Sequence, residues 1–138
     1  MLSNEDGVTV DANTDSLAAF AELSIGQLYI LPEAVQDTMP IMFGAYALNQ
    51  GGADSGPFAA RFTLDDGETR DVQFPSIAAG ASRWEEWMHD PLRAGVHTIA
   101  VQLDPDNQVQ EGNKFDNMAT LPFHVDPAFI TDTADGTI

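Results

Sequence analysis

The sequence predicts an all-β fold, a sandwich of two antiparallel sheets with seven strands. Two observations predict it: short apolar segments recur along the chain, and turn-forming residues separate them at nearly regular spacing. At 138 residues the chain has room for one domain with a real core, and it contains no cysteine that could form a disulfide. We therefore expect one β-sandwich domain between flanking segments.

Each expected strand lies between turn-forming residues. Pro32 follows the first strand and Pro40 opens the second. Asn49 and Gly51 follow the second strand, where the Asn side chain is expected to shape a turn by bonding the backbone. The turn 65–67, Asp-Asp-Gly, joins the third and fourth strands, because Gly favours the positive φ of a tight hairpin. The expected strands are 22–31, 40–48, 57–64, 70–75, 81–88, 95–103 and 117–125.

Alternation of apolar and polar residues assigns faces to these strands. In the third strand Phe58, Phe62 and Leu64 share one face, while Arg61 and Thr63 share the other. The sixth and seventh strands alternate in the same way, and their inward residues are Ile99, Val101, Leu103, Ala119, Leu121, Phe123 and Val125. These residues predict the core between the two sheets.

The second strand is apolar on both faces. If Phe43 faces the core, then Met42, Tyr46 and Leu48 face outward, which is unusual for a solvated sheet. Two explanations are open. Other parts of the chain cover these side chains, or they form a contact surface, extended by Trp84, for a neighbouring domain or a second copy of the chain.

The fifth strand carries two carboxylates and two tryptophans. Glu85 and Glu86 are neighbours, so they point to opposite faces of a regular strand and cannot flank one glycosidic bond. Trp84 and Trp87 diverge for the same reason, so at least one of them is expected in the core. An outward tryptophan would offer an aromatic platform for a glycan or a protein partner.

Acidic segments flank the expected domain. We expect an acidic N-terminal linker at 1–21, with a short helix within 12–23 as the alternative, the sandwich at 22–125, and an acidic C-terminal linker at 126–138. The 22 acidic residues against 5 Lys and Arg give a formal net charge of −17, which disfavours nucleic acid and anionic membranes as partners. No apolar run approaches the roughly 20 residues that span a bilayer, so membrane insertion is not expected. The chain is expected to be either cytoplasmic or a piece of a longer exported protein, and the linkers favour the second.

The polar loop 104–117, DPDNQVQEGNKFDN, connects the last two expected strands. It does not fit the EF-hand pattern, since Val109 stands where that pattern has Gly and Phe115 where it has Glu. The structural interpretation is that short side chains such as Asp104 and Asn117 bond nearby backbone amides. The alternative is an irregular calcium site, for which the candidate ligands are Asp104, Asp106, Glu111 and Asp116.

The histidines do not predict a zinc site, and no motif predicts catalysis. His97 has the phase of Val101 and faces the core. His124 is out of phase with Phe123 and faces outward, so the two histidines cannot share a metal. There is no G-x-S-x-G motif and no Gly-rich phosphate loop. We expect no cofactor other than the alternative calcium.

Several short motifs occur in an order that is typical of one known family. They are 48–52, Phe58 with Phe62, the 65–67 turn, 77–80, Trp87, 95–98, and Asp104, Asn107, Val109, Glu111, Asn113, Asp116 and Asn117. Together they resemble the CARDB domain, the cell-adhesion-related domain found in bacteria, across the expected sandwich. The chain departs from the usual paired Asn of that family, because Asp116 takes the first place of the pair.

This resemblance implies an immunoglobulin-like or fibronectin-like sandwich that is one module of a larger extracellular or surface protein, without catalytic activity. The expected function is a structural or adhesion module, either a spacer or a protein-interaction unit. Its expected partners are neighbouring domains of the parent chain or another surface protein, with self-association as a further expectation. The alternative function is a calcium- or glycan-binding module that uses the 104–117 loop or the outward aromatic face.

Overall fold

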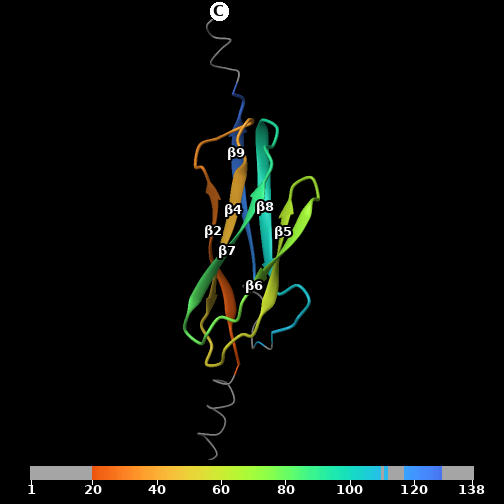
Figure 1. Ribbon diagram of the computed structural model, residues 1–138. Coiled ribbons are helices and arrows are strands. Elements are labelled where there is room, and N and C mark those ends of the chain that lie inside the picture. The colour runs from red at the N-terminus through yellow and green to blue at the C-terminus, as the bar shows by residue number, and fades with distance from the viewer. Residues whose placement is uncertain (1–19, 110, 112–116, 129–138) are drawn as a thin grey trace, which may run out of the picture.

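The computed structural model describes residues 20–109, 111 and 117–128 (Figure 1). Nearly all of the predicted N-terminal linker, 1–21, and most of the predicted C-terminal linker, 126–138, therefore lie outside the described residues. Over the described ranges the chain forms strands and no helix. In particular, this part of the chain contains no helix with the length and apolar character needed to cross a membrane.

Two sheets pack face to face to form a sandwich (Figure 1). The three-stranded sheet has the order β2-β4-β7, with bounds β2 Leu23–Leu31, β4 Ile41–Asn49 and β7 Ser82–His89. The five-stranded sheet has the order β3-β9-β8-β5-β6, with bounds β3 Val35–Gln36, β9 Met118–Asp126, β8 Gly95–Leu103, β5 Phe58–Leu64 and β6 Thr69–Phe74. The prediction of an all-β sandwich is confirmed.

The described residues form eight strands, not the seven that the sequence predicts. The additional strand is β3, which pairs in parallel with β9, so the five-stranded sheet is mixed rather than purely antiparallel. Its two residues are too few for alternation to be recognised, and they lie between Pro32 and Pro40. Val35 is only 2% exposed, and the burial of this side chain accounts for the packing of β3 against the sandwich.

A bulge at Gly26 keeps β2 in phase with the core. The register with β4 shifts between Ile25 and Gln27, which leaves Gly26 as the extra residue. Ile25 packs against the core before the bulge, and Leu28 and Ile30 do so after it. Without the bulge, strict alternation would have pointed the apolar side chains in the second half of the strand toward solvent.

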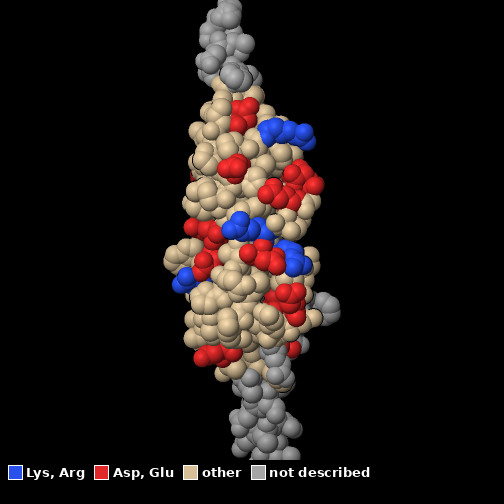
Figure 2. Space-filling model, turned by 45° about the vertical axis from the view of Figure 1, so that its right-hand side comes forward, with Lys and Arg blue, Asp and Glu red and all other residues tan. Residues whose placement is uncertain are grey.

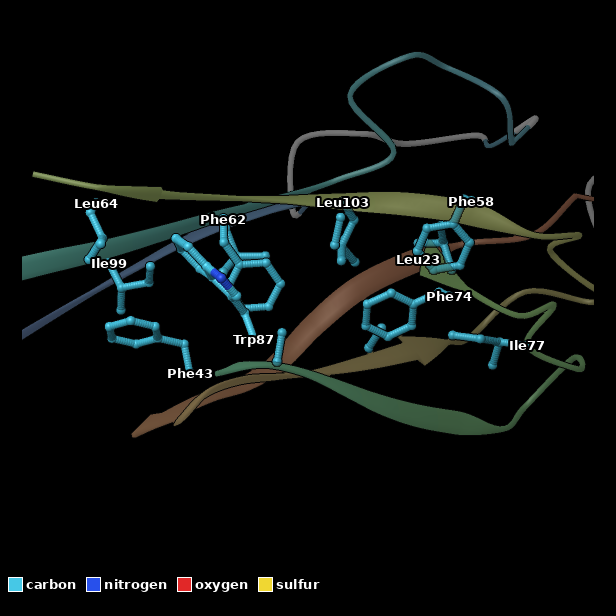
Figure 3. Packing of buried hydrophobic residues seen from close by; sticks show 14 of the residues in the cluster. Leu23, Phe43, Phe58, Phe62, Leu64, Phe74, Ile77, Trp87, Ile99 and Leu103 are labelled. Carbon is cyan, nitrogen blue, oxygen red and sulfur yellow. The ribbon is translucent and has the colours of Figure 1, made fainter. Parts of the chain in front are cut away.

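Aromatic side chains from both sheets form the centre of the core (Figure 3). The ring centroids of Phe43 on β4 and Trp87 on β7 lie 5.7 Å apart. Phe62 on β5 reaches across from the other sheet, 6.2 Å from Trp87. Phe58 and Phe74 stack at 5.1 Å. Burial of each ring stabilises the fold by roughly 1.5–3 kcal/mol relative to leaving it in water.

Asn49 closes the N-terminal end of the sandwich. This side chain is 1% exposed, and its Oδ1 accepts hydrogen bonds from the N–H groups of Glu22 and Gly51, each at 3.0 Å. Its Nδ2 donates to the carbonyl oxygens of Ala53 and Ile77, at 2.8 and 2.9 Å. One buried amide therefore joins the start of β2 to the loops that precede β5 and β7, as the expected turn-shaping role requires.

Asp37 fixes the chain at the C-terminal end. Its N–H donates to the carbonyl oxygen of Asp126 at 2.9 Å, and its Oδ1 accepts from the N–H of Ala128 at 3.0 Å. These bonds continue the pairing of β3 with β9 beyond the last strand. The described chain enters at the start of β2 and leaves after β9, at opposite ends of the sandwich (Figure 1).

Charged side chains are dispersed over the face of the molecule that Figure 2 shows. Figure 2 shows Asp and Glu separated by uncharged residues, with basic residues beside several of the acids. Arg61 and Asp71 form an exposed ion pair, with 2.8 Å between Nε and Oδ1. Dispersed exposed charge of this kind favours solvation and adds little to stability.

Candidate functional site

The side of the three-stranded sheet that faces away from the core is the candidate binding surface, and we call it the outer face. The strand register places four residues from each strand on it. They are Ser24, Gln27, Tyr29 and Leu31 of β2, Met42, Gly44, Tyr46 and Leu48 of β4, and Ser82, Trp84, Glu86 and Met88 of β7. Among these twelve residues only Glu86 is charged, whereas charged residues make up 20% of the chain.

The residues predicted from sequence to form a contact surface lie together on the outer face. Met42, Tyr46 and Leu48 are half-buried and alternate with the buried residues of β4. Trp84 is 52% exposed, and its ring centroid lies 5.5 Å from that of Tyr46 with a 36° tilt between the rings. The side chains thus point as the alternation predicts, while their role in an interface stays a prediction.

Tyr29 lies across the middle of the outer face. A Cβ atom at Gly44 would come within 2.0 Å of Tyr29 Cζ, so only glycine leaves room for this ring. The Tyr29 hydroxyl donates to Glu86 Oε2 at 2.7 Å, on the far side of β4. Burial raises the pKa of Tyr29 and the Glu86 carboxylate raises it further, so the hydroxyl remains a donor. The ring is therefore held between β2 and β7.

Sequence reasoning missed Tyr29 and Glu86 as parts of this surface. The available signal was Gly44, because a glycine inside an apolar strand often marks the close approach of another group. It also missed Leu31 and Met88, which are 48% and 59% exposed and flank Met42 in one row across the sheet. Both omissions depend on strand register, which the sequence does not state.

The neighbouring residues of β7 diverge as the sequence predicts. Trp87 is buried in the core at 6% exposure, while Trp84 faces solvent. Glu85 lies on the opposite side of the strand from Glu86 and accepts from Arg83 Nε at 2.8 Å. The two glutamates do not face each other across a substrate-sized gap.

Asp104 organises the start of the 104–117 loop. Its φ of 52° lies in the left-handed region, and its two carboxylate oxygens accept from the N–H groups of Gln108 and Val109, both at 2.8 Å. Val109 is 3% exposed and belongs to the core. Asp104 thus performs the turn chemistry that the sequence predicts, and it directs an apolar side chain into the end of the sandwich.

Glu111 joins the same loop to β2. Its Oε1 accepts from the N–H of Leu23 at 2.8 Å, and its Oε2 accepts from Asn117 Nδ2 at 2.9 Å. Asn117 is 3% exposed, and its Oδ1 has no hydrogen-bond partner among the described residues. A buried acceptor without a partner is uncommon and marks a place where a bound group would be stabilising.

The predicted calcium ligands are not assembled into a complete site. Asp104, Asp106 and Glu111 are described, whereas Asp116 lies outside the described residues. Within the described ranges, no group of three or more His, Cys, Asp or Glu side chains is placed to hold a metal ion. Calcium binding by this loop therefore stays a prediction.

Two histidines hold the β5–β6 turn at the C-terminal end. His97 faces inward, as predicted, with Nδ1 3.1 Å from Asp65 Oδ1 and Nε2 2.8 Å from the carbonyl oxygen of Arg93. Burial of Asp65 opposes its ionisation, but hydrogen bonds from the Thr98 N–H and from His97 outweigh it and hold the pKa of Asp65 below its ordinary value. His124 is exposed on β9, so it does not approach His97 as a zinc ligand would.

His89 makes the second contact with this turn. Its Nε2 lies 2.8 Å from Glu68 Oε1, and its Nδ1 lies 2.6 Å from the carbonyl oxygen of Asp90. Burial lowers the pKa of His89, but the bonds to Glu68 and to the Asp90 carbonyl outweigh burial and raise the pKa above its ordinary value of 6.5. Both ring nitrogens face acceptors, so only the protonated ring satisfies both.

Comparison with known proteins gives one family and several similar folds. The sequence model of the CARDB family matches residues 20–121. A CARDB domain from Pyrococcus furiosus, solved in complex with di-metal ions, is similar with a TM-score of 0.67 and 20% identity, over 77% of this chain and 89% of that one. A domain of a provisionally assigned cell surface protein from Methanosarcina acetivorans has a TM-score of 0.61 and 25% identity, over 75% of this chain and 92% of that one. None of the curated proteins compared with the chain matches it.

The His89 pair predicts a pH-dependent contribution to stability. Because the folded pKa is raised, the contribution is fully present below about pH 6.5 and is lost as the pH rises through the folded pKa. Glu68 is 47% exposed, so solvent limits the effect to about 0.3–1 kcal/mol. We expect His89→Gln to be less stable than the wild type in urea unfolding at about pH 5.5, and nearly equal to it at about pH 8.5. A difference that is constant across this range would contradict the assignment.

Proposed function

Because this chain belongs to the CARDB family, we propose that it is a non-enzymatic structural module of a larger surface protein and that it acts as a spacer between neighbouring segments. The single observation that carries this proposal is the position of the two ends. The described chain enters at one end of the sandwich and leaves at the other (Figure 1). A rigid domain with this geometry separates whatever precedes it from whatever follows it.

Both attachment points are fixed by hydrogen bonds, which a spacer requires. At the N-terminal end, Asn49 accepts from the N–H of Glu22, and Glu111 accepts from the N–H of Leu23. At the C-terminal end, Asp37 accepts from the N–H of Ala128. These bonds set the direction in which the chain meets the sandwich on each side, so the module transmits orientation as well as distance.

We also propose the outer face as the surface through which the module contacts a partner, which is another surface protein, a second copy or a glycan. The support is the concentration of exposed apolar and aromatic residues there, with Leu31, Trp84 and Met88 each about half exposed. An extracellular location agrees with the name given to the Methanosarcina acetivorans relative. The net charge of −17 favours a well-solvated surface, and this holds outside the cell as well as inside it.

Tandem arrays test the spacer proposal. We expect one, two and three copies of the full chain, joined end to end, to lengthen in small-angle X-ray scattering by at least about 30 Å per copy, the length of a nine-residue strand. Asp37→Ala releases Ala128, so the same array should show a broader distribution of lengths with the same folded modules. Arrays whose maximum dimension hardly grows with copy number would contradict the spacer role.

We propose calcium binding at the 104–117 loop as a second candidate function. The observation that favours it is Asn117 Oδ1, a buried oxygen without a hydrogen-bond partner in the part of the chain that the structure describes, beside the Glu111 carboxylate. Calcium prefers oxygen ligands of these two kinds. The Pyrococcus furiosus CARDB domain was solved with di-metal ions, which is a precedent for metal on this fold. Amide donors already occupy the Asp104 carboxylate, so an ion would compete with them.

A melting experiment tests the calcium proposal. At a calcium concentration of about ten times Kd, binding adds about 1.4 kcal/mol to the free energy of unfolding and raises Tm. Glu111→Gln keeps an acceptor for Leu23 but removes the charge, so it should abolish the shift. Asp66→Asn, in the β5–β6 turn, is the matched control and should retain it. An equal shift with magnesium, or one that survives Glu111→Gln, would exclude a specific calcium site.

A further inference from the structure

The centre of the outer face is an aromatic platform built from all three strands. Gln27, Tyr46 and Trp84 form one row across β2, β4 and β7. Tyr29 lies in the next row, over Gly44 and bonded to Glu86. Three rings therefore occupy two adjacent rows of one exposed sheet face, and the rings of Tyr46 and Trp84 are 5.5 Å apart.

The Tyr29 ring is fixed before any ligand arrives. Its approach to Gly44 places it against the backbone of β4, and its hydroxyl is held by Glu86 at 2.7 Å. A ring that is already ordered loses little conformational entropy on binding. Such a ring can pack against the C–H groups on one face of a sugar, through burial and weak C–H contacts.

Hydrogen-bonding groups surround the rings. Gln27 and Ser82 are exposed on the two edge strands of this sheet and offer an amide and a hydroxyl. Glu86 is exposed, and its carboxylate has more acceptor sites than the one bond from Tyr29 uses. Stacking rings bordered by amide, hydroxyl and carboxylate groups suit a ligand that is rich in hydroxyls.

Charge narrows the class of ligand. The chain carries −17, so it repels anionic glycans and opposes pairing with a second copy that has the same charge. Glu86 is the one charged residue among the twelve of the outer face, so the face offers a cationic partner only a single carboxylate to pair with. A neutral ligand is not repelled by the charge of the chain, and it does not require carboxylates on the outer face to pair with.

We propose that the outer face binds a neutral oligosaccharide, which stacks on Tyr29, Tyr46 and Trp84 and hydrogen-bonds Gln27 and Glu86. This inference rests on the outer face being the contact surface of the module, as proposed above, and it names the partner's chemistry. A module with this property would hold its neighbours apart while attaching the protein to an uncharged glycan.

A glycan array tests this proposal with the full chain. Its neutral set contains glucans, mannans, xylans and N-acetylglucosamine oligomers, and its acidic set contains uronic and sulfated oligosaccharides. We expect binding to members of the neutral set and none to the acidic set. By titration calorimetry with the best neutral oligomer, Trp84→Ala should weaken the affinity about tenfold or more, because a half-exposed stacking ring is lost. Tyr29→Phe should weaken it less, since the ring remains and only its anchor to Glu86 is removed.

Met118→Ala is the matched control. Met118 is 63% exposed on β9, in the other sheet, so this variant should bind like the wild type. Absence of binding to every neutral oligomer, or binding that Trp84→Ala leaves unchanged while its circular dichroism is native, would overturn the proposal. A concentration-dependent dimer that Trp84→Ala abolishes would also overturn it, although the outer face would then still be a contact surface. The lengthening of tandem protein arrays in small-angle X-ray scattering, which tests the spacer proposal, depends on none of these outcomes.

Discussion

A sandwich of two sheets is open at both ends, and closure of those ends is the constraint on which the rest of this structure depends. Along their length, the strands hydrogen-bond each other's backbone N–H and C=O groups. The loops at the ends, however, carry polar groups next to an apolar core. At the N-terminal end, the buried side-chain amide of Asn49 makes four hydrogen bonds to backbone groups, two as acceptor and two as donor. Asp104 and Glu111 add bonds to the backbone of the same region, and Val109 fills the space between them and the core.

The same constraint separates the residues with structural roles from the residues of the proposed binding surface. Because buried polar groups at the ends position the chain, the outer face of the β2-β4-β7 sheet is not needed for closure. Gly44 allows Tyr29 to lie across that face, and Glu86 fixes it there. The ends therefore determine the direction of the chain, while the outer face is available for the contacts proposed above. At the C-terminal end, His89 and His97 hold the β5–β6 turn through Glu68 and Asp65.

Sequence predicts the parts of this fold that depend on local patterns. Alternation identified the long strands and the outward direction of Tyr46, and turn chemistry identified the roles of Asn49 and Asp104. It did not identify β3, because two residues show no period, and it could not show the bulge at Gly26 that reverses the phase of β2.

The missing parts of the candidate site have a different cause. The bond between Tyr29 and Glu86 joins residues 57 positions apart and requires the register of three strands. The bond between His97 and Asp65 likewise joins residues 32 positions apart. Such pairs follow from tertiary packing, which a single sequence does not specify.

The central claim is that buried polar groups close the ends of the sandwich. Its most direct test is urea unfolding of Asn49→Ala, compared with Gln50→Ala at an exposed neighbouring position. End closure by Asn49 predicts a loss of about 3 kcal/mol or more for the first variant and less than about 0.5 kcal/mol for the second. A loss below about 1 kcal/mol for Asn49→Ala would contradict the claim.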